Sequence, residues 1–157
     1  MELIEGTNLL QYVNQNHGLK INEVQNIFSQ LIIAIEYLHN ELNISHRYLK
    51  LENVMLDFGF SSIKKNIMST LCGSIPYCAP EVLKCQTYTK EADIWCLGVI
   101  LYSLVSGKLP FFCSNLNQLV NMICNQEPAY SNVFNPPVRD LISRLLIKDP
   151  RHRVTIE

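Results

Sequence analysis

The chain has 157 residues, a length that predicts a single domain or one lobe of a larger one. Thirteen Lys and Arg residues nearly balance fourteen Asp and Glu, leaving a formal charge of −1 at pH 7. This balance argues against a nucleic-acid or membrane-surface binder that acts through bulk charge. Apolar residues make up 48%, enough for a sizeable core.

The sequence contains no evident signal peptide, membrane-spanning segment or paired-cysteine motif. Met1 to Glu5 lack the basic start and long apolar run of a signal peptide. The longest apolar stretch, Ile94 to Val105, has about twelve residues and is too short to span a bilayer. The six cysteines form no C-x-x-C pair, so we expect reduced thiols, a buried Cys96 and a cytoplasmic location.

The first predicted helix begins at Asn22, a capping residue followed by Gln25 three positions later. Ile32 and Ile33 widen its apolar face, which otherwise recurs at helical spacing through Val24, Ile27, Phe28, Leu31, Ile35 and Leu38. Residues 40–51 break this pattern and are predicted to form a loop. Residues 57–80 show no sustained period, and long irregular segments of this kind tend to be functional.

A second helix is predicted over residues 90–106, capped by Thr89 and ended by Gly107. Its apolar residues surround the axis, which indicates a central buried helix with Trp95 and Tyr102 in the core. A weaker helix covers 116–124. A fourth follows Pro136-Pro137 and ends at Asp149-Pro150, with its apolar face at Val138, Leu141, Ile142, Leu145 and Leu146. Strand signal is sparse, so the predicted fold is mainly α. His17, His39 and His152 show no partner pattern and are expected to be structural or exposed.

Four short motifs follow one another in a fixed order. They are HRYLKLEN at 46–53, DFG at 57–59, CGS at 72–74 leading to APE at 79–81, and DIWCLG at 93–98 with Asp149-Pro150 and Arg153 near the end. Each motif alone is weak, whereas the ordered set is a strong signal. The set resembles the C-terminal lobe of a eukaryotic protein kinase over essentially the whole chain. The stretches at 71–74 and 51–53 are similar to the calcium/calmodulin-dependent and AMP-activated group of Ser/Thr kinases.

The residue types support phosphoryl transfer independently of the resemblance. Mg²⁺ needs hard oxygen ligands, and Asn53 and Asp57 are such a pair. Lys50 would supply a cation near the transferred phosphate. The reaction also needs a carboxylate that orients the attacking hydroxyl and takes its proton.

The resemblance implies a large lobe built as a helical bundle with a few short strands, using ATP and Mg²⁺ to phosphorylate Ser or Thr of a protein. It implies that the backbone of Glu2 and Ile4 binds adenine, with Met55 as the floor of the pocket. Glu52 is similar to the acidic residue that reads substrate arginine, although Asn8 stands where many such kinases have a second Glu.

The resemblance also implies roles around the activation segment. Arg47 would pair with a phosphate on Thr70, with Ser69 as the neighbouring candidate, and Ser74 would lie beside the substrate. Glu81 and Arg153 would form a buried structural ion pair. Asp93 would hold the backbone of the catalytic loop from below.

Three departures from the family pattern bear on activity. Tyr48 stands where the family has the catalytic Asp, and a phenol, with an unperturbed pKa near 10, is a poor base at neutral pH. Only residues 54–56 separate Asn53 from Asp57, where kinases place a β-hairpin. Residues 1–6 resemble the hinge between the lobes, so we expect the small lobe, with its Gly-rich loop and phosphate-pairing Lys, to be absent.

These departures leave three functions open. The first is a Ser/Thr kinase-like domain that is inactive or very weak, in which Tyr48→Asp alone does not restore activity. The second is a pseudokinase module that binds a protein partner through the groove around Ser74 and the helix after Leu116, or through the apolar residues Leu3, Ile4, Leu9 and Leu10. The third is a truncated or mis-spliced product without function. None of the three involves nucleic acid or a membrane.

Overall fold

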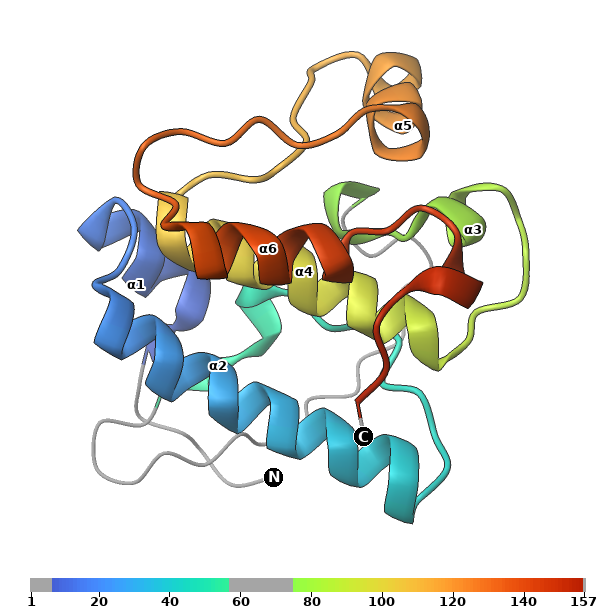
Figure 1. Cartoon of the computed structure of the whole chain (residues 1–157), viewed down its shortest axis with the longest axis horizontal. Coiled ribbons are helices and arrows are strands. Elements are labelled where there is room, and N and C mark those ends of the chain that lie inside the picture. Colours follow the sequence, from blue (N-terminus) through green and yellow to red (C-terminus); the bar gives the residue numbers. More distant parts are fainter. Residues whose placement is uncertain (1–6, 57–74, 157) are drawn as a thin grey trace.

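The computed structural model describes residues 7–56 and 75–156 (Figure 1). Helices dominate these ranges, so the predicted mainly α fold is confirmed. The only sheet in the described part pairs two short strands, β1 and β2, in antiparallel register. The elements are β1 (Thr7–Asn8), α1 (Leu9–Asn16), α2 (Ile21–Glu36), β2 (Met55–Leu56), α3 (Pro80–Leu83), α4 (Lys90–Ser106), α5 (Leu116–Asn125) and α6 (Pro136–Leu145).

Helix α4 lies at the centre of the molecule and has the predicted bounds. Thr89 precedes it in an extended conformation, and Gly107 ends it in the left-handed region at φ 68°. Every residue from Ala92 to Leu104 is buried, and α4 packs against α2 on one side and α6 on another (Figure 1). The predicted positions of Trp95, Cys96 and Tyr102 in the core are therefore confirmed.

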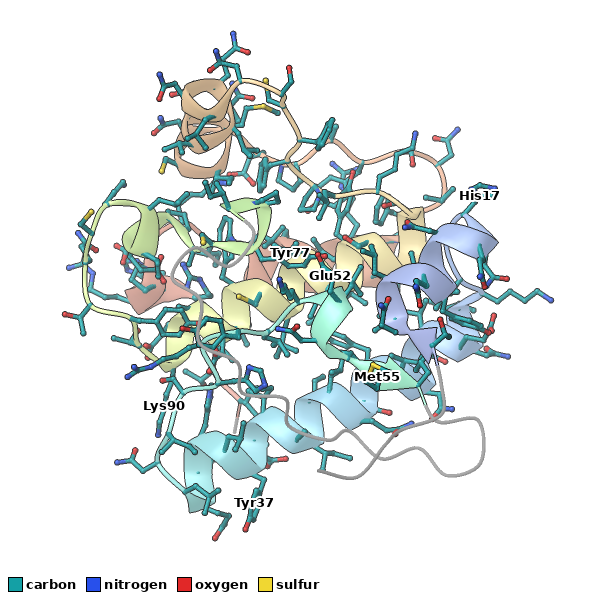
Figure 2. The ribbon with its side chains drawn as sticks, turned by 180° about the vertical axis from the view of Figure 1, so that it is seen from behind. His17, Tyr37, Glu52, Met55, Tyr77 and Lys90 are labelled. Atoms are coloured by element: carbon teal, nitrogen blue, oxygen red, sulfur yellow. The ribbon has the colours of Figure 1, made fainter. Side chains whose placement is uncertain are left out.

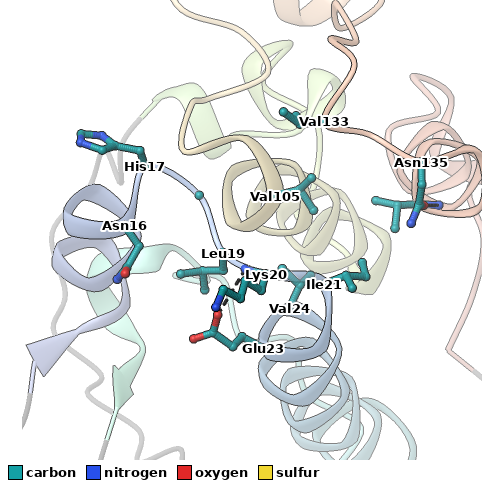
Figure 3. Close-up of a pocket in the computed structure, with 12 residues that line it drawn as sticks. Asn16, His17, Leu19, Lys20, Ile21, Glu23, Val24, Val105, Val133 and Asn135 are labelled. Atoms are coloured by element: carbon teal, nitrogen blue, oxygen red, sulfur yellow. Dashed lines mark hydrogen bonds between the residues drawn. The ribbon is translucent and has the colours of Figure 1, made fainter.

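The turn between α1 and α2 lies against the end of α4 (Figure 3). His17 and Gly18 both have positive φ, at 53° and 103°, and the N–H of Leu19 donates to the carbonyl of Leu104 at 2.8 Å. A Cβ on Gly18 would lie 2.6 Å from the carbonyl oxygen of Val105, so only glycine permits this approach. The turn fixes how α1 and α2 are placed on the central helix.

Several helix boundaries and faces differ from the prediction. Helix α2 begins at Ile21 because the carboxylate of Glu23 accepts the N–H of Lys20 at 3.2 Å and satisfies the helix start. Ile33 is 64% exposed, not part of the buried face. Helix α6 ends at Leu145, well before Asp149, and Leu141 on its predicted apolar face is 37% exposed.

Helix α2 continues into one π-helical turn, Tyr37–Glu41, where a loop was predicted from residue 40. The N–H of Leu42 donates to the carbonyl of Tyr37 at 3.3 Å, an i to i+5 hydrogen bond that widens the last turn. The segment that follows is irregular up to a 3₁₀ turn at Leu51–Asn53.

Close packing of α4 and α6 depends on Gly98. A Cβ at this position would lie 2.7 Å from Cδ2 of Leu146 and 2.9 Å from Cβ of Leu145. We expect Gly98→Ala to lower the free energy of unfolding by about 1–3 kcal/mol, because the helices must separate to admit the methyl group. Urea unfolding followed by circular dichroism measures this loss. Unchanged or increased stability, as helix propensity alone would give, would contradict the close approach.

Candidate functional site

Asp93 is the hydrogen-bonding centre of the loop that carries the sequence motif. Its side chain in α4 is fully buried. Oδ2 accepts the backbone N–H of His46 at 2.7 Å and contacts Nε2 of His39 at 2.9 Å, while Oδ1 accepts the N–H of Arg47 at 3.0 Å and the hydroxyl of Tyr88 at 2.8 Å. Burial raises the pKa of this carboxyl, but the four interactions outweigh burial and hold the pKa below its usual range. Asp93 therefore stays ionised and anchors the loop.

The loop backbone at Arg47 adopts a conformation that Asp93 stabilises. Arg47 has φ of 70°, in the left-handed region that residues with a Cβ seldom occupy. Its N–H points to the buried carboxylate while its side chain is exposed. The Arg47 guanidinium is therefore available to a solvent-side anion.

His39 and Tyr88 belong to this anchor, although the sequence singled out neither as a partner of Asp93. His39 is 4% exposed, and the ammonium of Lys90 donates to its carbonyl oxygen. Burial raises the pKa of Tyr88, which keeps its phenol protonated as a donor. In the sequence, the local indication that His39 is buried is that it directly follows Leu38, a residue of the apolar face, and Leu38 is buried too.

Tyr48 and Asn53 are joined across the loop. The side-chain amide of Asn53 donates through Nδ2 to the carbonyl of Tyr48 at 2.7 Å, and the N–H of Tyr48 lies 3.3 Å from Nδ1 of His46. Because Nδ2 of Asn53 is used in this way, Oδ1 is the atom left to ligate a cation. Lys50 is half-buried in the same loop, and its carbonyl accepts the N–H of Asn53 at 3.0 Å.

Strand β2 carries Met55, which pairs with Asn8 of β1. The N–H of Leu9 extends this pairing by donating to the carbonyl of Val54 at 2.8 Å. Met55 is half-buried on the side of the molecule opposite to the view of Figure 1 (Figure 2). Asn8 accepts the N–H of Gln11 at 2.9 Å through its side chain and so caps α1.

Glu52 lies beside a hollow of about 320 Å³, with Tyr77 close to it (Figure 2). Its Oε2 is buried and has no hydrogen-bond partner among the residues that the structure describes. Burial, followed by the nearby Glu52 carboxylate, raises the pKa of the Tyr77 phenol. A buried carboxylate oxygen without a donor is costly, and the lining of this hollow carries one acid, Glu52, and one base, Lys108.

Glu81 and Arg153 form a bidentate buried ion pair. Nη1 and Nη2 of Arg153 lie 2.7 and 3.0 Å from the two carboxylate oxygens, and both side chains are almost wholly buried. Arg153 also donates to the backbone carbonyls of Ile147, Lys148 and Glu91. The pair thus ties α3 to the segment after α6 and to the start of α4.

The remaining candidate residues, Glu2, Ile4, Asp57, Thr70 and Ser74, lie outside the described residues, as does Ser69. The sequence-predicted partners of Asn53 and Arg47 are among them, so the metal pair and the phosphate pair stay predictions. Across 7–56 and 75–156 there is no group of three His, Cys, Asp or Glu side chains that would hold a metal ion. None of the helices in these ranges has the length and apolar character needed to cross a membrane.

Comparison with known proteins bears on the loop anchored by Asp93. The family model of the protein kinase domain matches residues 1–157, the whole chain. The chain belongs to the protein kinase family. The kinase resemblance of the ordered motifs is thereby confirmed, and the helical fold agrees with it.

Curated relatives are Ser/Thr kinases. A probable serine/threonine-protein kinase of Dictyostelium discoideum is 38% identical over all of this chain and 20% of its own length. Testis-specific serine/threonine-protein kinase 5 of Mus musculus is 37% identical over 99% of this chain and 45% of its own length. The carbon catabolite-derepressing protein kinase of Secale cereale is 38% identical over 99% of this chain and 33% of its own length.

These matches cover only part of each relative and differ in length from this chain. The chain spans less than half the length of each of the three relatives. The match to the Dictyostelium kinase extends over 169 residues, twelve more than the 157 of this chain, so the matched region of this chain is shorter. All three relatives are Ser/Thr kinases by name, so the chain is a Ser/Thr kinase-like domain.

Proposed function

We propose that this kinase-like domain retains the loop that binds Mg·nucleotide but transfers phosphoryl groups very slowly or not at all. The observation that carries the proposal is the bond from Asn53 Nδ2 to the Tyr48 carbonyl, in a loop held by Asp93. This loop is built to present Asn53, while the residue beside it is a tyrosine in place of the carboxylate that takes the proton.

The residues in the described part fit a bound metal and nucleotide in chemical type. Oδ1 of Asn53 would be one ligand of Mg²⁺, with Asp57 proposed as the second. Met55 would lie under the adenine, and the backbone of Glu2 and Ile4 would pair with its edge. When bound, Mg²⁺ neutralises the charge of the phosphates, and Lys50 would add a second cation. Arg47, whose side chain is exposed, is proposed to pair with a phosphate on Thr70.

The proposed substrate is a protein Ser or Thr next to a basic residue. The support for this preference is Glu52, whose buried Oε2 lacks a donor beside the 320 Å³ hollow. Asn8 does not provide a second group that recognises a basic residue, because its side chain caps α1. We therefore propose recognition of one basic residue through Glu52 alone, with Ser74 on the side of the phosphate acceptor.

Thermal unfolding with and without Mg·ATP tests the binding half of this proposal. We expect the unfolding temperature of the 157-residue chain to rise with Mg·ATP, because a ligand of the folded state stabilises it. Asn53→Leu, which removes Oδ1, is expected to abolish the rise. The matched control Asn121→Leu changes an exposed amide on α5 and should keep it. A cooperative transition that ignores Mg·ATP would contradict nucleotide binding.

Phosphate transfer to a basic Ser peptide tests the catalytic half. We expect no transfer above background, and less than about a tenfold gain from Tyr48→Asp, because phosphoryl transfer depends on positioning both metal ligands and only three residues join Asn53 to Asp57. Robust transfer by either protein would overturn the proposed inactivity.

A second candidate function is a protein-binding module of pseudokinase type. The observation that favours it is the exposed apolar surface at the start of α5, where Phe112 is 73% and Leu116 is 54% exposed. A stoichiometric protein partner that binds without ATP and is lost in Phe112→Ser would support this function. In that case the unfolding transition would be cooperative and insensitive to Mg·ATP.

A further inference from the structure

A second, apolar hollow lies behind the catalytic loop, away from Glu52. It has a volume of about 260 Å³ and lies between the second half of α2 and the loop that follows it. Leu31 and Ile35 of α2 and Leu38 of the π-helical turn line it on one side, and Leu49 and Val54 line it on the other. All five side chains are buried, so this part of the lining belongs to the hydrophobic core.

The mouth of this hollow is formed by the π-helical turn. Tyr37 and Leu42 line it and are 56% and 45% exposed, so an occupant would remove apolar surface of both from water. The i to i+5 bond between these two residues sets their spacing at the opening. Single π-helical turns are rare and occur frequently at functional sites, which is a second and independent indication of binding here.

The lining specifies the chemistry of the occupant. No Asp, Glu, Lys or Arg lines the hollow, so a charged group would be buried without a partner. Tyr37, His46 and Asn53 are the lining residues with polar side-chain atoms. The exposed acids Glu36 and Glu41 flank the mouth residues in the chain. An anion is therefore disfavoured both inside the hollow and at its edge.

The volume limits the size of the occupant. An apolar cavity of about 150 Å³ holds benzene, and sites for drug-sized ligands begin at about 300 Å³. The volume of about 260 Å³ lies between these limits and matches a compact bicyclic ring better than a single ring. Volume and polarity together point to an uncharged molecule of one or two rings that carries at most one polar group.

We propose that this hollow is a binding site for an uncharged aromatic molecule of one or two fused rings. The occupant contacts Leu49, Asn53 and Val54, so it binds against the same loop that carries Tyr48 and Lys50. The hollow shares Asn53 with the proposed metal site, and its apolar lining requires no bound nucleotide.

Indole is the probe that tests the site, with methyl NMR of the whole chain as the readout. We expect saturable shifts of the Leu38, Leu49 and Val54 methyl groups with a Kd on the order of 1 mM. Val133 and Val138, which line the more polar hollow shown in Figure 3, should not shift. Indole-3-acetate is expected to bind at least about tenfold more weakly because it carries a buried charge. Absence of saturable shifts, or equal binding of the anion, would overturn the proposal.

Two variants on the same helix locate the binding. Ala34→Trp fills the hollow that Ala34 lines and should weaken indole binding at least about tenfold. Ile33→Trp adds the same side chain one position earlier, at a residue that is largely exposed, and should bind as the wild type does. If Ala34→Trp fails to fold, Leu42→Glu at the exposed mouth replaces it with the same expected loss. Equal binding by the blocking and control variants would refute the assignment.

Discussion

Asp93→Asn is expected to lower the free energy of unfolding by about 3 kcal/mol or more. Each carboxylate oxygen of Asp93 faces two partners, at distances between 2.7 and 3.0 Å. An asparagine has one oxygen, so its NH₂ group must point at the donors that the other oxygen accepted. Whichever way the amide turns, the backbone N–H of either His46 or Arg47 faces an NH₂ group and loses its acceptor.

Urea unfolding together with amide hydrogen exchange measures this effect. The exchange of the His46 and Arg47 amides should accelerate most, because their N–H groups donate directly to Asp93. The matched control is Asp140→Asn, which removes the same charge from an exposed i, i+4 pair with Arg144 and should cost only a small fraction of the Asp93 loss. Equal losses in the two variants would show that Asp93 is not the anchor of the loop.

The same substitution predicts a pH dependence. The folded-state pKa of Asp93 lies below its ordinary value, so its contribution is fully present above the unfolded-state pKa of about 3.9. The contribution is lost as the pH falls through the folded-state pKa. The stability difference between wild type and Asp93→Asn should therefore be constant near neutral pH and shrink in strong acid.

Arg153→Met is expected to cost about 3–5 kcal/mol, because it leaves the buried carboxylate of Glu81 without its cation. The double variant Glu81→Leu with Arg153→Met should recover part of this loss, since no buried charge then remains. Recovery is incomplete because Arg153 also donates to three backbone carbonyls, which stay without donors.

A double-mutant cycle by urea unfolding measures the coupling between the two residues. The matched control is Arg151→Met, two positions earlier in the chain, whose partner Asp149 lies 2.7 Å away at the surface. This exposed pair is expected to contribute little, so the control should unfold close to the wild type. If the two single variants at Glu81 and Arg153 were additive, the ion pair would not be the source of the stability.

The sequence predicted a helix correctly where its caps and its apolar pattern all lie within one stretch of the chain. Helix α4 was placed correctly because Thr89, Gly107 and a continuous apolar run all lie within one stretch. Helix α1 was missed because eight residues, LLQYVNQN, carry too short a pattern, and its cap Asn8 was interpreted only through the kinase resemblance. The exposure of Ile33 could not be predicted, since helical spacing does not say how much of a wide apolar face another element covers.

The candidate site was predictable where motifs carried it and not where distant residues meet. The motifs indicated Asp93, Glu81 and Arg153, and the structure places each in a buried hydrogen-bonded position. His39 reaches Asp93 across 54 positions in the chain, a pairing that no local pattern encodes. The bond between Asn53 and Tyr48 was likewise invisible, because it joins a side chain to a backbone carbonyl and requires no particular residue at 48.

The way in which the loop is anchored has a consequence for how such a domain diverges. Asp93 holds His46 and Arg47 by their backbone N–H groups, and Asn53 holds Tyr48 by its backbone carbonyl. These bonds form with any side chain at position 48. Selection for a stable fold acts on backbone atoms of this loop, whereas selection for a catalytic base acts on the side chain at position 48. A lineage can therefore replace that side chain and still keep the anchored loop.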